Sequence, residues 1–124
     1  MKRDMDLVRA IFLIAENHED EYLQSSDFRR GLSEQFPDLQ WSNEKLVVHV
    51  RLLREARLVE AGFSSSFGGE DFYDLRLTWE GHEFIADASD PRVWEEAKSK
   101  GGEASFAVFK QILVEVAKKM LMGK

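Results

Sequence analysis

The sequence predicts a mostly helical α+β fold in which three helices are followed by a two-stranded hairpin and then by further helices. Apolar residues recur at helical spacing before about residue 56 and after residue 79. Between these regions, two short β-prone stretches flank a segment rich in Ser and Gly. The chain has 124 residues, is 44% hydrophobic and contains nine Phe, which suits one hydrophobic core and excludes intrinsic disorder.

The first two helices are predicted from apolar spacing and capping residues. Leu7, Ile11 and Ile14 share one face of a helix over residues 4–17, where Asp4 or Asp6 can accept hydrogen bonds from the first turn. A shorter helix is expected after residues 25–27, a Ser-Ser-Asp run in which each residue can cap, and it ends before Pro37.

The third predicted helix begins at Ser42, a suitable N-cap, and Trp41 can pack on Leu46 as a hydrophobic staple. One face should be buried, and His49 lies near it; the face consists of Leu46, Val50 and Leu53. Arg57 then stands where a glycine would most easily end the helix. The helix is therefore expected either to run on or to place Arg57 in a left-handed conformation that costs about 1 kcal/mol.

A β-hairpin should follow, with strands over residues 58–63 and 72–78 and a long flexible tip over residues 64–71. Thr78 is the expected cap of a fourth helix over residues 79–88. Asp90 and Pro91 mark the start of the next helix. The last helix, residues 104–121, carries an apolar seam of Phe106, Phe109, Leu113, Val116 and Met120.

This order of elements is that of a winged helix-turn-helix domain, in which the third helix reads DNA and the hairpin is the wing. We therefore expect a winged helix-turn-helix domain over residues 1–88, with a three-helix core and a two-stranded wing. Residues 89–124 are expected to form a C-terminal helical extension that packs on this domain.

Several segments also resemble one family. The wing exit over residues 75–84, with its Arg-Leu-Thr-x-x-Gly pattern, is similar to that of many bacterial winged-helix regulators. With the N-terminal residues 1–7, the Asp-Pro-Arg-Val-Trp stretch at 90–94 and residues 106–119, nearly the whole chain resembles the Domain of Unknown Function 2513 family. The resemblance implies a small winged-helix-like protein of bacterial, phage or prophage genomes, and it implies no particular chemistry.

Basic residues on the second and third helices are the candidates for nucleic-acid binding, because guanidinium groups reach phosphates and guanine edges. They are Arg29, Arg30, Lys45, Arg51 and Arg54, with Arg57 beside them. Two observations oppose this role. Residues 25–58 carry five acids against six basic residues, and residues 64–74 contain three acids and no Lys or Arg. The alternative is that these side chains form helix-surface pairs such as Arg51 with Glu55.

No catalytic, metal-binding or cofactor-binding pattern is present in the sequence. There is no cysteine, the three histidines lie far apart, and neither a nucleophile elbow nor a phosphate-binding glycine loop occurs. We therefore predict no enzyme activity and no cofactor. No apolar run approaches the roughly 20 residues of a membrane helix, so no membrane association and a cytoplasmic location are expected.

Two functions remain open. The first is a DNA-binding or transcription-regulatory protein of phage or mobile-element origin, which binds double-stranded DNA as a homodimer through Val116, Met120 and Leu121 of the last helix. The second is an acidic winged-helix module that binds a protein partner, as an adaptor, a DNA mimic or an inhibitor of a host factor. The formal net charge of −6 favours the second.

Overall fold

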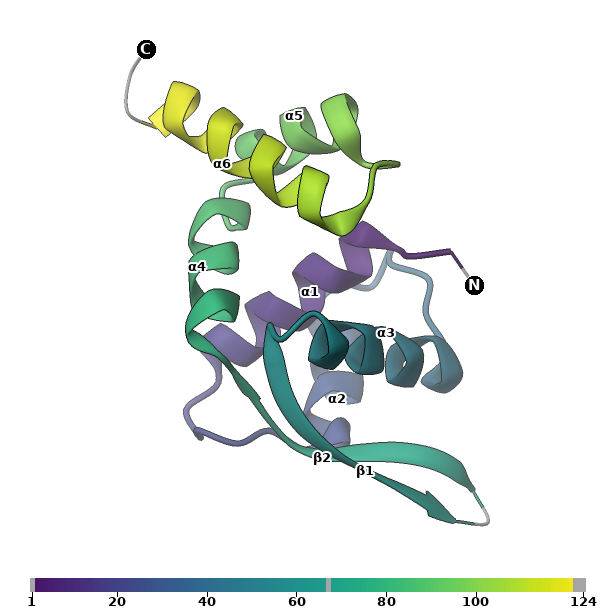
Figure 1. Ribbon diagram of the computed structural model, residues 1–124. Coiled ribbons are helices and arrows are strands. Elements are labelled where there is room, and N and C mark those ends of the chain that lie inside the picture. Colours follow the sequence, from purple (N-terminus) through teal and green to yellow (C-terminus); the bar gives the residue numbers. More distant parts are fainter. Residues whose placement is uncertain (1, 67, 122–124) are drawn as a thin grey trace. The chain divides into compact units, whose positions relative to one another are not determined.

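The computed structural model describes residues 2–66 and 68–121 and confirms a mostly helical α+β fold (Figure 1). Within these residues there are six helices and one two-stranded antiparallel sheet. The elements are α1 (Met5–Asn17), α2 (Ser25–Gln35), α3 (Asn43–Glu55), β1 (Val59–Ser66), β2 (Gly69–Leu77), α4 (Trp79–Ala88), α5 (Pro91–Gly101) and α6 (Phe106–Leu121).

The chain divides into two compact units, Met1–His82 and Glu83–Lys124. The division lies within α4, whereas the sequence predicted a boundary at the end of that helix. The first unit holds α1 to α3 and the hairpin. The packing of residues 89–124 on the first unit stays a prediction.

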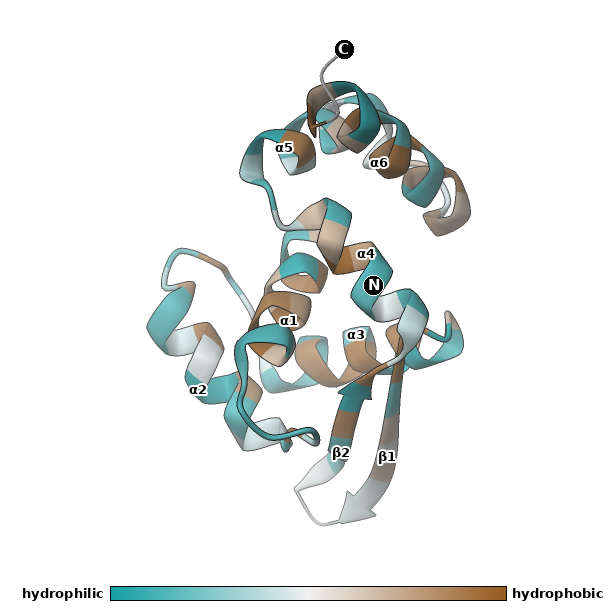
Figure 2. Cartoon of the chain, turned by 90° about the vertical axis from the view of Figure 1, so that its left-hand side faces the viewer, coloured by the Kyte–Doolittle hydropathy of each residue, from teal (hydrophilic) through white to brown (hydrophobic). Residues whose placement is uncertain are grey.

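The core of the first unit forms where α1, α2 and α3 meet the inner face of the hairpin. Figure 2 shows hydrophobic colouring along α1 and a largely hydrophilic α2. The helix α1 contacts α2, α3 and β2, so it is the central helix of this unit. The predicted caps of α1 and α3 are present: Asp4 accepts from the Leu7 N–H at 3.2 Å and Ser42 from the Lys45 N–H at 3.1 Å. The fully buried side chains include Leu7, Ile11, Phe12, Phe28, Leu32, Leu46, Val50, Leu58 and Leu75.

The start of α2 differs from the prediction. Gln24 is the N-cap residue, and the predicted cap residues Ser25 and Asp27 lie inside the helix. The Asp27 carboxylate instead accepts from the Gln24 backbone N–H at 2.7 Å, so it stabilises the first turn from the third helical position.

The prediction of a long flexible tip on the hairpin is wrong. The strands pair from Val59 and Leu77 as far as Ser66 and Gly69, through most of the Ser/Gly segment. Gly69 has φ of +98°, a conformation that favours glycine and permits a tight reversal. Serine needs no burial, so this composition suits a solvent-exposed hairpin as well as a loop.

A bulge in β2 connects the hairpin to the segment before α2. The register shifts between Glu60 and Gly62, and Asp74 on the opposite strand has φ of +51°. The Gln24 side-chain amide donates to Asp74 Oδ1 at 2.8 Å and accepts from the Asp74 N–H at 3.2 Å. Beside it, Leu23 and Leu75 exchange both backbone hydrogen bonds, at 2.8 and 2.9 Å. Leu23 thus forms an isolated antiparallel β-bridge to β2.

The exit of the hairpin is fixed to the end of α3. Thr78 donates its backbone N–H to the Leu58 carbonyl at 3.1 Å and its hydroxyl to the Arg57 carbonyl at 2.8 Å. The same hydroxyl accepts from the Gly81 N–H at 3.1 Å, which confirms the predicted cap of α4. A Cβ at Gly81 would collide with the Leu58 carbonyl oxygen. The Thr-x-x-Gly pattern is therefore explained by close backbone contact at this junction.

The second unit has an aromatic core. Trp94 packs edge-on against Phe84 and Phe109, with ring centroids 6.3 and 5.4 Å apart, and Phe84 also contacts Phe106. Asp90 caps α5 as predicted, accepting from the Arg92 N–H at 2.8 Å. Hydrogen bonds from the Arg92 side chain and backbone lower the pKa of Asp90 to about 2.

Candidate functional site

The five predicted nucleic-acid-binding residues all lie in the first unit, and all five make contacts within it. Arg29 and Arg30 project from α2, and the other three, Lys45, Arg51 and Arg54, from α3. We refer to the surface formed by α2, α3 and the α3-facing side of the hairpin as the hairpin face.

Arg29 connects three elements of the hairpin face. Its Nε donates to Asn43 Oδ1 at 2.9 Å, at the start of α3, and its Nη1 donates to Ser25 Oγ at 3.0 Å. Its Nη2 lies 2.9 Å from Asp71 Oδ2 on β2, and the Ser25 hydroxyl donates to the same carboxylate oxygen at 3.0 Å. Arg29 therefore joins the hairpin to both helices.

Arg51 and Arg54 contact the hairpin from α3. Arg51 forms an ion pair with Glu70 of β2, which corrects the predicted Arg51–Glu55 pair along the helix. The Arg54 guanidinium lies 4.6 Å from the centroid of Phe63 and that of Arg51 lies 5.5 Å from it. Arg54 also donates to the Ala61 carbonyl at 3.3 Å. The periodicity of α3 could not reveal these partners because they lie on another element.

Lys45 and Arg30 are paired with acids on helices. Lys45 Nζ lies 2.7 Å from Asp4 Oδ2 at the start of α1, and Arg30 Nη2 lies 2.9 Å from Asp27 Oδ1 on its own helix. Burial would raise the pKa of Asp4, but hydrogen bonds from Lys45 and the Leu7 N–H outweigh it and lower that pKa. The Asp4 carboxylate is therefore ionised at neutral pH and neutralises Lys45.

The sequence did not identify Asp71 and Glu70 as the partners of Arg29 and Arg51. Desolvation would raise the pKa of Asp71, but hydrogen bonds from Arg29, the Phe72 N–H and Ser25 outweigh it, so the pKa is lowered. The available signal was the opposite charge of the predicted wing, which has three acids, and of two predicted helices rich in arginine. Charge alone did not specify which arginine meets which carboxylate.

The two units differ in charge. Residues 1–82 contain ten Lys and Arg against 16 Asp and Glu, a formal charge of −6, whereas residues 83–124 contain seven of each. The unit with the candidate binding face therefore carries the whole net charge of the chain. Such a charge repels a nucleic-acid backbone.

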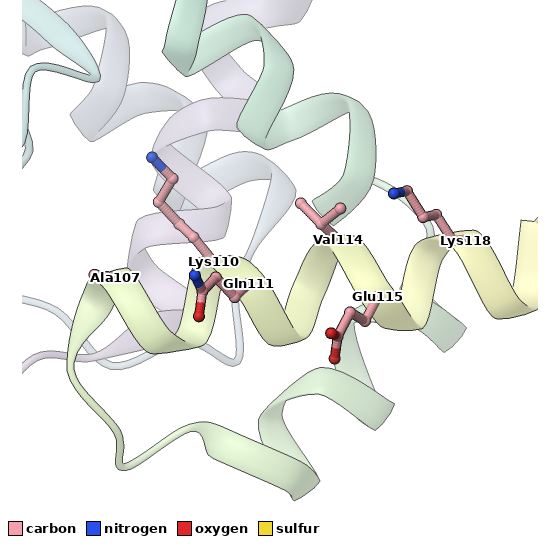
Figure 3. A pocket seen from close by; sticks show the side chains of 6 residues that line it. All are labelled: Ala107, Lys110, Gln111, Val114, Glu115 and Lys118. Atoms are coloured by element: carbon pink, nitrogen blue, oxygen red, sulfur yellow. The ribbon is translucent and has the colours of Figure 1, made fainter.

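The predicted dimer residues fall into two groups. Val116 is buried, with 4% of its surface exposed, whereas Met120 and Leu121 are 42% and 50% exposed. Another part of α6 bounds a shallow hollow, shown in Figure 3 with the side chains of Ala107, Lys110, Gln111, Val114, Glu115 and Lys118. All six come from one helix, so they do not converge on a ligand from several sides.

His49 has a structural role. It is 1% exposed, its Nε2 accepts from the Asp4 backbone N–H at 2.8 Å, and its Nδ1 donates to the Lys45 carbonyl at 2.8 Å. Among the described residues, no group of three or more His, Asp or Glu side chains is placed to hold a metal ion. The described helices include none that is both long and apolar enough to cross a membrane.

These features define a small, mostly helical α+β protein whose hairpin is joined to two helices by ion pairs. The chain belongs to the family described as hypothetical protein DUF2513, whose model matches residues 2–107. It is 32% identical to a protein of Haemophilus influenzae strain Rd, described as uncharacterized, over 98% of this chain and 99% of that protein. No solved structure was found to match the chain.

Proposed function

We propose that the chain is a non-enzymatic winged-helix module that binds a protein partner through the hairpin face. The order α1-α2-α3-β1-β2, with the bridge from Leu23 to β2, supports the winged-helix assignment. In winged-helix regulators with this order of elements, the third helix reads DNA, and α3 is the third helix of this chain.

The ion pairs of the basic residues favour a protein partner over DNA. Arg29, Arg30, Lys45 and Arg51 each pair with a carboxylate, and Arg54 covers Phe63. A DNA phosphate would have to displace these contacts and approach a unit with a formal charge of −6. A mixed-charge surface with half-buried apolar side chains suits a protein.

A crosslinking experiment tests this proposal. A photoreactive amino acid is placed at Val48 or Leu52, which are half-buried on α3, and at the exposed Ser99 of α5 as the matched control. Irradiation in cells should give a discrete protein adduct from the α3 positions and none from Ser99. Adducts to DNA from the α3 positions, or identical adducts from all three, would contradict the proposal.

The second candidate is a DNA-binding regulator, favoured by the five basic residues on α2 and α3. Selection from genomic fragments at about 50 mM salt tests it, because backbone contacts are strongest at low salt. Retained fragments that are lost on Arg29→Ala would establish DNA binding and replace the protein-partner proposal. We expect no retained fragment.

A further inference from the structure

Two consecutive carboxylates of β2 cover arginines from two different helices. Glu70 pairs with Arg51 of α3, and Asp71 accepts hydrogen bonds from Arg29 and Ser25 of α2 at 2.9 and 3.0 Å. Because Glu70 and Asp71 are neighbours in sequence, the two arginine heads converge on one short stretch of the hairpin.

The arginines are held in place by more than their carboxylates. The Phe63 ring lies under both Arg51 and Arg54, and Asn43 and Ser25 accept from Arg29. These contacts would remain if the wing carboxylates lost their charge. The side chains of Arg29 and Arg51 are also 32% and 35% exposed, so a phosphate in solvent can reach them.

A carboxylate oxygen and a phosphate oxygen bind a guanidinium in the same way, through charge-assisted hydrogen bonds of 2.7–2.9 Å. Glu70 and Asp71 therefore stand where two phosphates of a nucleic-acid backbone would stand. A wing that contacts phosphates needs positive charge, whereas residues 64–74 of this chain contain three acids and no Lys or Arg.

We propose that Glu70 and Asp71 act as internal phosphate substitutes that mask a cationic site for duplex DNA, formed by Arg29, Arg51 and Arg54. This inference rests on the proposed function, in which the hairpin face is the binding surface. The two wing acids keep that face from DNA and leave it to a protein partner.

Removal of the two charges tests the masking. Binding of a short random-sequence duplex is measured by fluorescence anisotropy at about 50 mM salt for the wild type, E70Q/D71N and the charge-matched control E19Q/E21Q. The control residues lie in the exposed segment between α1 and α2 and change the net charge equally. A fourth variant, E70Q/D71N/R29A/R51A, removes the unmasked cations.

The E70Q/D71N variant should bind DNA at least about tenfold more tightly than E19Q/E21Q. Its slope of log affinity against log salt should be steeper by about 1.8, since each freed arginine adds about 0.9. The fourth variant should return to the affinity of the wild type. E70Q alone, at a half-exposed position, should give a smaller gain and serves if D71N disturbs folding.

Two results would overturn the masking: affinity of E70Q/D71N no greater than that of the charge-matched control, or an unchanged affinity after the arginines are removed. Its failure is distinguishable from that of the proposed function. If neither wild type nor E70Q/D71N binds DNA, the masking fails and the protein-partner proposal stands. If the wild type binds DNA through Arg29 and Arg51, the protein-partner proposal fails. The ratio of the DNA affinities of E70Q/D71N and the wild type then decides whether Glu70 and Asp71 mask the site.

Discussion

Arg57 shows what a single residue contributes to the junction after α3. It has φ of +64°, so the left-handed alternative predicted from the sequence is confirmed. Its N–H donates to the Arg54 carbonyl, and its own carbonyl accepts from the Thr78 hydroxyl. The backbone geometry is thus useful although the side chain disfavours it.

Arg57→Gly should raise the free energy of unfolding by up to about 1 kcal/mol, because glycine adopts positive φ without the steric cost of a Cβ. Urea denaturation measures the change. Arg57→Ala is the control, since it removes the guanidinium and keeps the strained conformation. A glycine variant no more stable than the alanine variant would show that the conformation costs nothing here.

His49 should make stability depend on pH. Desolvation by burial lowers its pKa below the ordinary value of 6.5, despite the opposing effects of the Lys45 carbonyl and the Asp4 charge; the Lys45 charge lowers it further. The unfolded chain therefore binds the proton more readily. The contribution of His49 to the free energy of unfolding is fully present above pH 6.5. It is lost as the pH falls from there toward the lowered pKa of His49 in the folded protein.

Unfolding free energies between about pH 7.5 and about pH 5.5 test this effect. His49→Gln should reduce the slope in this range, whereas His82→Gln, at an exposed position of α4, should keep it. Equal slopes for the wild type and His49→Gln would assign the pH dependence to other groups.

At the scale of elements, the hairpin exit leaves no room for a side chain at position 81. Gly81→Ala places a Cβ against the Leu58 backbone carbonyl, which cannot move without breaking its hydrogen bond to the Thr78 N–H. We expect a loss of about 1–3 kcal/mol in the free energy of unfolding.

The matched control is Gly68→Ala at the hairpin tip, where nothing lies within 4 Å of the added Cβ. This variant should change the thermal midpoint little. If Gly81→Ala lowers the free energy of unfolding no more than Gly68→Ala does, the close contact at Leu58 does not restrict position 81.

The sequence predicted those elements whose signals are local. Asp4, Ser42 and Asp90 cap their helices through residues two or three positions away, so short-range patterns suffice. The predicted cap of α2 was wrong. The N-cap is Gln24, which hydrogen-bonds to Asp27 and also to Asp74, 50 residues away. No local pattern carries such a contact.

The candidate site follows the same rule. The basic residues were predictable from their positions on α2 and α3. Their partners were not, because Arg51 has Glu55 at the favoured helical spacing and yet pairs with Glu70 across the fold. Tertiary packing of the hairpin decided between the two carboxylates.

At the scale of the whole molecule, the end of α6 remains the predicted dimer contact. Met120 and Leu121 are exposed, so M120E/L121E should keep the fold and convert a dimer to a monomer in sedimentation equilibrium. Val108→Glu, on an exposed position near the other end of α6, is the control and should remain a dimer.

Val116→Glu is expected to unfold the second unit, because Val116 is buried. A circular dichroism spectrum distinguishes this loss of fold from dissociation. A wild-type protein that is monomeric at high micromolar concentration would rule out the dimer.

The contact between Leu23 and Leu75 also bears on the order of folding. The helices and the hairpin form from neighbours in sequence, whereas this bridge and the adjacent Gln24–Asp74 pair close a loop of about 50 residues. Loop closure costs entropy, so these contacts form only after the flanking elements exist. The amides of Leu23 and Leu75 should therefore gain protection from hydrogen exchange late in refolding, after those of α1 and α3. The Leu23–Leu75 bridge would then report the completion of the first unit.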